Sequence, residues 1–385
     1  MKKRFKFQEY LEYSTLGELS VLQKSIESYP PDTKIHEMIK QEIGQKSRPL
    51  KILFSTSGGQ TKGNSPSQRL AKRIMELYEN VSIDMYSIAF NPMPDNLDFS
   101  QYDLIWGEMD SGNHLVEAQH HGEKHGIPTY LHGEWIPPFA IEEGWTEHFG
   151  APTELSKRER YMNNLEAMKR ANLVSLALSD TAGGFQWIED KWGVTFKNAF
   201  VRYPACPKYA QLKEARGNSV ATIARANAGQ KKVAHTLEAI KRSKMKPKFL
   251  LIGGDKGMSY EGVDMESLGK FNTDDKVKVF AQSKVAVQHW SGIPPAEAIQ
   301  QGCVVLSYDM PYMRELYGDA LIWVKKDDIN ALSEAIDYWL THDEEREIQA
   351  TKALNLLYGG KCGVKLEDHR ANLVMKKIFE TLGTL

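Results

Sequence analysis

The feature that most constrains this chain is an alternation of short apolar segments with segments of helical spacing. Residues 49–57, Pro-Leu-Lys-Ile-Leu-Phe-Ser-Thr-Ser, are typical of a buried strand, and residues 67–77 carry apolar side chains at helical spacing. Further strands, with helical stretches separating several of them, are predicted at 81–88, 102–106, 128–132 and 173–179. Such alternation predicts a parallel sheet covered by helices on both faces.

The alternation starts again after a linker at 205–218. Strands are predicted at 219–224, 248–254, 284–289, 303–307 and 321–324, and helices at 232–240, 294–301 and 328–341. The chain therefore has an α/β fold of two Rossmann-like, doubly wound domains in tandem. Since ligands bind at the carboxyl ends of parallel strands, we expect an active site in the cleft between the domains.

The expected divisions are a helical extension at 1–48, a first domain at 49–205, a second domain at 206–360 and a C-terminal segment at 361–385. The extension is polar and is interrupted by Pro30-Pro31. It serves either as a structural prop or in oligomerisation or acceptor contact, and the sequence leaves both open. The C-terminal segment holds a helix at about 369–382, which is able to pack back on the first domain.

Charge and cysteine content exclude several classes of protein. The 49 Lys and Arg residues nearly balance the 50 Asp and Glu residues, so the overall field gives no reason to expect a polyanionic partner. The three cysteines are far apart and suit a reducing compartment. Without a secretory signal or an apolar run long enough for a membrane span, we expect a cytoplasmic protein.

The strongest local motif runs from Ser291 to Gly302, directly after a predicted strand. Gly292 permits a close approach of backbone to ligand, and the two prolines at 294–295 suit the first turn of a helix. The free amides of such a turn attract a diphosphate, while Glu297 can accept hydrogen bonds from sugar hydroxyls. An ordinary strand-to-helix junction with a surface glutamate is the alternative.

A second motif, residues 224–232, is Ala-Arg-Ala-Asn-Ala-Gly-Gln-Lys-Lys and also follows a strand. Arg225 offers a bidentate fork to phosphate, and Lys231 or Lys232 offers a point charge. A solvated basic loop is the alternative.

From about 219 to 340 the chain resembles the second domain of retaining glycosyltransferases of the GT-B fold, specifically their large family four, the glycosyl transferases group 1. The family's motifs occur here in one order. They are Ala224-Arg225 with Lys231, the strand end at Gly253-Gly254, the turn Leu268-Gly269, the segment His289–Ala298 and the run Gly302–Glu315.

The resemblance implies roles in binding a nucleotide-sugar donor. Arg225 and Lys231 would hold the diphosphate, and Glu297 the ribose. The other donor-binding residues implied are Leu268 and Gly269 beside the base, and His289, Ser291, Gly292 and Ile293 near the phosphates and the donor sugar. His289 replaces the first of the family's paired glutamates, which makes the identity of the donor sugar an open question.

The first domain resembles the family more loosely. Gly58-Gly59 looks like its glycine-rich loop near the donor phosphate, and His132 occupies the place of a family histidine near the reacting carbon. A structural histidine is the alternative for His132. The aromatic segment 134–139 forms either a wall for the acceptor or packing between segments.

The resemblance implies transfer from a nucleotide-diphosphate sugar, such as a UDP-sugar, with retention of anomeric configuration. The catalytic residues would be His132, Arg225 and Lys231, and neither cofactor nor metal is required. The acceptor is a glycan, lipid, protein, small molecule or modified nucleic-acid base. Two alternatives are a nucleotide-sugar binding protein without turnover and an epimerase-like enzyme.

The sequence disfavours two further interpretations, a metal site and a dinucleotide oxidoreductase. Glu117, His121 and His125 share a helical face, but such faces are usually solvated and not metal sites. A dinucleotide oxidoreductase would require G-x-G-x-x-G after a strand, which neither Gly58-Gly59 nor Gly253-Gly254 provides.

Overall fold

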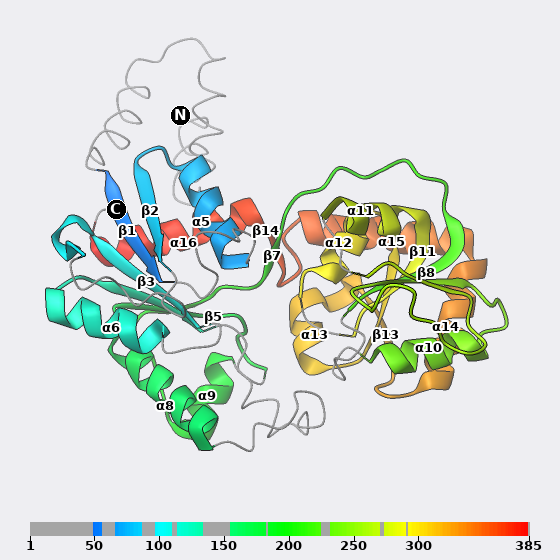
Figure 1. Cartoon of the computed structure of the whole chain (residues 1–385), viewed down its shortest axis with the longest axis horizontal. Coiled ribbons are helices and arrows are strands. Elements are labelled where there is room, and N and C mark those ends of the chain that lie inside the picture. The colour runs from blue at the N-terminus through cyan, green and yellow to red at the C-terminus, as the bar shows by residue number, and fades with distance from the viewer. Residues whose placement is uncertain are drawn as a thin grey trace, which may run out of the picture.

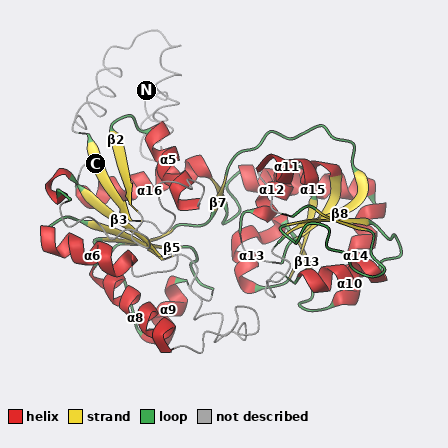
Figure 2. Ribbon diagram, in the orientation of Figure 1, coloured by secondary structure: helices red, strands yellow, loops and turns green. Residues whose placement is uncertain are grey.

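The computed structural model describes residues 49–55, 66–86, 97–109, 114–133, 155–181, 184–224, 232–269, 273–289 and 292–383. The expected extension at 1–48 lies outside these residues. The described elements gather in two lobes, each with a parallel sheet (Figure 1). Helices lie on both sides of each group of strands (Figure 2), which confirms the predicted α/β class.

The first lobe contains six described strands in the order β2-β1-β3-β4-β5-β6, all parallel. The strands are β1 (Leu50–Ser55), β2 (Val81–Tyr86), β3 (Leu104–Met109), β4 (Thr129–Gly133), β5 (Leu173–Leu176) and β6 (Ala199–Val201). The helices between them are α5 (Pro66–Leu77), the 3-10 turn η1 (Phe99–Gln101), α6 (His114–His125), α8 (Leu155–Arg170) and α9 (Phe185–Trp192).

Successive strand residues point to opposite sides of a sheet, so strands whose successive residues are apolar give this sheet two apolar faces. Trp106 and Tyr130 lie on the face covered by α5 and by α16 (Glu367–Leu382). Ile105 and Leu131 lie on the face covered by α6, α8 and α9. Continuous apolar strands such as β1 follow from burial on both faces.

The second lobe repeats the architecture, with six described parallel strands in the order β10-β9-β8-β11-β12-β13. The strands are β8 (Gly217–Ile223), β9 (Lys248–Ile252), β10 (Met265–Ser267), β11 (Ser283–Val287), β12 (Val304–Tyr308) and β13 (Ile322–Val324). The helices are α10 (Val233–Arg242), α11 (Thr273–Gln282), α12 (Pro294–Gln300), α13 (Pro311–Tyr317), the 3-10 turn η4 (Gly318–Ala320), α14 (Ile329–Thr341) and α15 (Asp343–Tyr358). Helices α10 and α14 cover one face, and α11, α12 and α15 the other (Figure 1).

The chain crosses between the lobes twice, at adjacent places. Two-residue strands β7 (Ala205–Cys206) and β14 (Lys365–Leu366) pair in parallel between the lobes (Figure 1). The predicted linker at 205–218 therefore contains a strand, which is too short to give a periodic signal. After β14, helix α16 returns to the first lobe and contacts α5 and β5.

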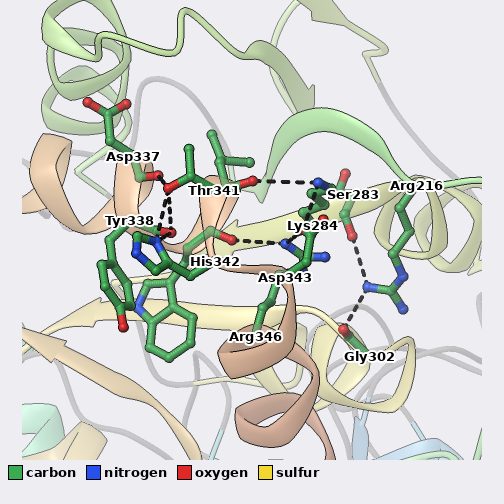
Figure 3. A network of polar contacts seen from close by, with 12 residues as sticks. Arg216, Ser283, Lys284, Gly302, Asp337, Tyr338, Thr341, His342, Asp343 and Arg346 are labelled. Atoms are coloured by element: carbon green, nitrogen blue, oxygen red, sulfur yellow. Dashed lines mark hydrogen bonds and ion pairs between the residues drawn. The ribbon is translucent and has the colours of Figure 1, made fainter.

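A polar network fixes the rest of this linker to the amino ends of the second sheet's strands (Figure 3). The Arg216 guanidinium donates to the carbonyls of Ser283 (3.2 Å) and Gly302 (2.6 Å). Nearby, Lys284 donates to the carboxylate of Asp343 (2.9 Å), which also pairs with Arg346. These contacts secure the junction between α14 and α15 at the edge of the sheet away from the predicted ligand site.

A single carboxylate links α13 of the second lobe to the first lobe. Glu315 accepts hydrogen bonds from the backbone N–H groups of Ser179 (2.5 Å) and Thr181 (3.1 Å) and from the Thr181 hydroxyl (2.6 Å). The turn that it holds follows β5, so it lies at the carboxyl edge of the first sheet. The two carboxyl edges are thus joined by contacts of a charged acceptor, which are among the stronger hydrogen bonds.

The packing of α16 predicts that residues far along the chain stabilise the first lobe. Ile378 on α16 is fully buried against this lobe's core. We expect Ile378→Ala to lower the free energy of unfolding by about 2–4 kcal/mol through lost burial and a residual cavity. Urea denaturation measures the change. The control is Ile348→Ala on α15, where the side chain is 70% exposed and a change of less than about 0.5 kcal/mol is expected. Equal effects would contradict the packing role.

Candidate functional site

The predicted donor residues that the structure describes, such as His289 and Glu297, follow strands of the second sheet. The strand order reverses there between β8 and β11, since β9 and β10 lie to one side of β8 and β11 to the other. Such a switch point is where open parallel sheets bind ligands. Arg225 comes shortly after the end of β8, and His289 lies two residues after the end of β11.

His289 is held in place by contacts with Tyr308 and Tyr312. The two rings stack with centroids 4.0 Å apart, and the Tyr308 backbone N–H donates to His289 Nδ1 (3.0 Å). The Tyr312 hydroxyl donates to the His289 carbonyl (3.2 Å). Because Nδ1 accepts a hydrogen bond, the proton of the neutral ring is on Nε2. Nε2 is buried and has no hydrogen-bond partner among the described residues.

Burial lowers the pKa of His289 to about 3, with a further lowering from the charges of His235 and Lys232. The ring is therefore uncharged at neutral pH and offers a hydrogen-bond donor, where a glutamate would offer an acceptor. The replacement of the family's glutamate by His289 therefore exchanges a hydrogen-bond acceptor for a donor.

The helix after His289 begins at Pro294, as the sequence predicted. Gly292 has a φ of +156°, a value that L side chains rarely adopt, and its carbonyl accepts from the Tyr317 hydroxyl. Of the first three helical positions only Ala296 carries a backbone N–H, because the other two are prolines. This turn therefore offers an anion fewer amides than an ordinary helix start, and side chains must supply more of the positive charge.

Glu297 is 2% exposed and points one oxygen toward a cation. Lys276 Nζ on α11 lies 2.5 Å from Glu297 Oε1, and the Tyr209 hydroxyl lies 3.4 Å from the same oxygen. The second oxygen, Oε2, is buried without a hydrogen-bond partner among the described residues. A buried carboxylate oxygen is costly when left unpaired, so this one is suited to a ligand hydroxyl.

Leu268 and Gly269 form the turn after β10. The Leu268 N–H donates to the Leu251 carbonyl, and the Gly253 N–H donates to the Gly269 carbonyl, both at 2.9 Å. Gly269 has a φ of +73°, and a Cβ there would lie 3.1 Å from the Lys256 Cβ. The turn thus fixes two strand ends beside each other and requires glycine.

In the first lobe, His132 lies on β4 in register with Glu108 on β3 and Ser175 on β5. Its Nδ1 is 2.8 Å from the Ser175 hydroxyl oxygen. Glu108 and Arg202 form an ion pair at 2.6 Å, and both side chains are buried. Burial, together with the charges of Arg202 and Arg370, lowers the pKa of His132 well below its ordinary value.

Several predicted site residues lie outside the described residues. These are Gly58, Gly59, Arg225, Lys231 and Ser291, together with the aromatic segment 134–139. The structure brings His289, Gly292, Ile293 and Glu297 together along one strand-to-helix connection. Lys232, the lysine next to Lys231, forms an ion pair with Asp327 (3.0 Å).

Sequence reasoning missed the partners of these residues. Lys276 lies on a helix that was not predicted, and Tyr308, which directly follows the strand predicted at 303–307, was not assigned a role. Glu108, Ser175 and Arg202 each lie at or just after a strand's carboxyl end. That shared position, applied to every predicted strand, would have been the signal that finds them.

The helical face of Glu117, His121 and His125 belongs to α6. The Phe99 ring stacks on His121 (4.7 Å) and on His125 (4.2 Å). The described part of the chain contains no group of three or more potential metal-ligating side chains. None of the helices within it is both long and apolar enough to cross a membrane.

The neutral state of buried His289 has a consequence for stability. Its pKa in the folded protein is about 3, against about 6.5 in an unfolded chain. As the pH falls below about 6.5 the unfolded state gains a proton that the folded state does not, so stability is lost toward acid. We expect His289→Gln to lose about 2 kcal/mol less unfolding free energy than the parent protein between pH 7.5 and pH 5.

Urea denaturation at both pH values measures this difference. His369→Gln, at an exposed position on α16, is the matched control and is expected to follow the parent protein. An equal acid loss in His289→Gln and the parent protein would show that His289 is charged in the folded state.

Comparison with known proteins follows the same division into lobes. The family model described as "Glycosyl transferases group 1" matches residues 210–355. No curated protein sequence matches the chain.

Solved structures match over both lobes. Sucrose-phosphate synthase from Thermosynechococcus elongatus has a TM-score of 0.64 at 11% identity, covering 87% of this chain and 99% of that one. HepE of Anabaena in complex with UDP-glucose has a TM-score of 0.61 at 15% identity, covering 87% and 100%. An α-glucosyltransferase in complex with UDP-glucose and DNA containing an abasic site has a TM-score of 0.57 at 8% identity, covering 86% and 98%.

These identities are low, so the solved structures establish the fold alone. The chain therefore has the GT-B fold, and its residues 210–355 match the family model of the glycosyl transferases group 1.

Proposed function

We propose that this protein transfers a glycosyl group from a nucleotide-diphosphate sugar to an acceptor, with retention of anomeric configuration. The family match over 210–355 supports glycosyl transfer. The observation that carries the assignment to this site is the buried Oε2 of Glu297, which has no hydrogen-bond partner in the part of the chain that the structure describes. This oxygen would accept a hydrogen bond from a ribose hydroxyl of the donor.

The diphosphate would be held mainly by side chains. Arg225 and Lys231 follow β8 in the sequence, and the prolines of α12 leave few amides to share the charge. As the bond from the anomeric carbon to phosphate breaks, negative charge grows on the leaving diphosphate. Fixed cations aimed at that charge lower the barrier to transfer.

Retention would arise by front-face transfer through an oxocarbenium-like state. No side-chain carboxylate has to attack the anomeric carbon, in contrast to the paired acids of retaining glycosidases. The leaving phosphate oxygen would take the acceptor's proton, and His132 would orient a donor hydroxyl or stabilise developing charge. The two cations would take the place of a divalent metal at the phosphates. The anomeric proton coupling in an NMR spectrum of the product tests retention.

UDP-glucose is the first donor to test, because the matching structures of HepE and of the α-glucosyltransferase were both solved in complex with UDP-glucose. A thermal-shift screen of common nucleotide-sugars identifies a donor, since a specific ligand raises the melting temperature. The acceptor class stays open between glycan, lipid, protein, small molecule and modified nucleic-acid base.

The alternative functions are a nucleotide-sugar binding protein without turnover and an epimerase-like enzyme. Both stay open because His289 stands where the family has a glutamate. Release of nucleoside diphosphate that requires an acceptor supports transfer. Conversion of the donor sugar without an acceptor supports epimerisation, and binding without any product supports the binding protein.

Removal of the Arg225 side chain tests its role in binding the diphosphate. We expect Arg225→Ala to slow transfer roughly 30- to 1,000-fold, because a charge-assisted contact to the transition state contributes about 2–4 kcal/mol. Steady-state kinetics with the identified donor measure this change. Arg242→Ala on α10, which removes an exposed arginine from the same domain, should leave the rate unchanged. Undiminished turnover in Arg225→Ala would remove the assignment.

A variant of Glu297 tests whether this residue acts in donor binding or in the chemical step. In Glu297→Gln the ribose hydrogen bond loses its charge, so we expect the KM for the donor to rise roughly 10- to 100-fold while kcat changes little. Glu334→Gln on α14, an exposed glutamate, is the control. A fall in kcat with unchanged donor affinity would contradict a contact made only to ribose.

A further inference from the structure

A chain of hydrogen bonds runs across the carboxyl edge of the first sheet and ends on His132. Arg202 Nη1 donates to the Tyr130 hydroxyl (3.2 Å), whose oxygen lies 2.7 Å from the Ser175 hydroxyl oxygen. The same Ser175 oxygen lies 2.8 Å from His132 Nδ1. All four side chains are fully buried, so water does not compete for these bonds.

The residue at the start of the chain determines the direction of every bond in it. A guanidinium has donors only, so the Tyr130 oxygen accepts from Arg202 and its hydrogen is free to be donated. Among the described residues, the Tyr130 and Ser175 hydroxyls have no hydrogen-bond partners outside this chain. Tyr130 therefore donates to Ser175, and Ser175 in turn donates to His132 Nδ1.

The reverse direction is physically unfavourable. If His132 Nδ1–H donated to Ser175 and Ser175 donated to Tyr130, the Tyr130 hydrogen would be buried without an acceptor. An unsatisfied buried donor loses its hydration without compensation.

Charges around the chain hold this arrangement in place. Glu108 Oε1 lies 2.6 Å from Arg202 Nη2, which fixes the guanidinium against the strand ends. Arg202 Cζ also lies over the rings of Trp106 (5.6 Å to the centroid) and Tyr130 (6.0 Å). Burial lowers the pKa of His132, and the positive charges of Arg202 and of Arg370 on α16 lower it further against a smaller opposing effect of the Ser175 backbone, so the ring is uncharged.

We propose that Arg202, Tyr130 and Ser175 are positioning residues that fix His132 as the neutral tautomer with its proton on Nε2. His132 then acts on the substrate as a hydrogen-bond donor to an oxygen, and it does not take the acceptor's proton. The catalytic consequence rests on the proposed function, whereas the tautomer itself does not.

The tautomer can be observed directly by ¹⁵N NMR of the full chain labelled at its histidine nitrogens, because protonated and unprotonated ring nitrogens have well-separated shifts. Comparison with the spectrum of His132→Gln assigns the His132 signals. The test variants are Tyr130→Phe and Ser175→Ala. Tyr78→Phe is the matched control, since Tyr78 is another buried tyrosine of the same core whose hydroxyl donates to Asn372 (2.8 Å) on α16.

In the parent protein and in Tyr78→Phe we expect a single His132 tautomer, with Nδ1 unprotonated and Nε2 protonated. In Tyr130→Phe and Ser175→Ala the direction is no longer imposed, so the Nδ1–H tautomer becomes populated. Once a donor and an acceptor are known, kcat should fall by up to about 100-fold in both variants and stay unchanged in Tyr78→Phe.

Two results would overturn the proposal. One is a parent spectrum with His132 protonated on Nδ1, and the other is a Tyr130→Phe spectrum identical to that of the parent. If Ser175→Ala does not fold, Tyr130→Phe decides the matter alone. Because the spectra require no substrate, they give an answer even if the protein transfers no sugar.

Discussion

The parallel pairing of strands is the constraint on which the rest of the structure depends. Residues that pair across adjacent parallel strands point to the same face, and all strands end at the same edge. Glu108, His132 and Ser175 are far apart in the sequence but occupy one register across β3, β4 and β5. In the second lobe the same geometry places the turn after β10 next to the end of β9 and puts the connection after β11 at the switch point. A polar site therefore forms wherever polar residues follow buried strands.

Both lobes present a buried histidine at that edge, and both histidines are kept uncharged by burial and neighbouring cations. In each case Nδ1 is engaged by a group of the protein itself, the Ser175 hydroxyl for His132 and the Tyr308 N–H for His289. Under the proposed function, a dianionic diphosphate requires the full positive charge of the site near the phosphates. The neutral histidine rings can orient a ligand through hydrogen bonds without adding positive charge away from the phosphates.

The architecture was predictable from the sequence because a doubly wound domain repeats one local pattern many times. Strands such as β1 and β12 and helices such as α5 and α14 were placed from apolar spacing alone. Short elements were not, since β7 and β14 have two residues each and gain their stability from pairing with each other. The helix α15 was missed although it spans Asp343–Tyr358, because its apolar residues do not form a marked stripe.

The candidate site was predictable where a motif is continuous in sequence, as from His289 to Glu297. Partners contributed by other elements were not, because their proximity depends on tertiary packing. Lys276 reaches Glu297 from a different helix, and Arg202 reaches Tyr130 across two strands. The Glu108–Arg202 pair in particular has no local signature, since each residue alone would be expected on the surface.

The return of α16 to the first lobe has a consequence for biosynthesis. Residues 367–382 leave the ribosome only after residues 206–360, which contain strands β8 to β13 and the described helices that cover them. The first lobe, although translated earlier, lacks the helix that covers Trp106, Tyr130 and Phe200 until then. Its maturation therefore follows that of the second lobe, and the nascent first sheet exposes an apolar face during translation, which makes this stage the one most in need of chaperone protection.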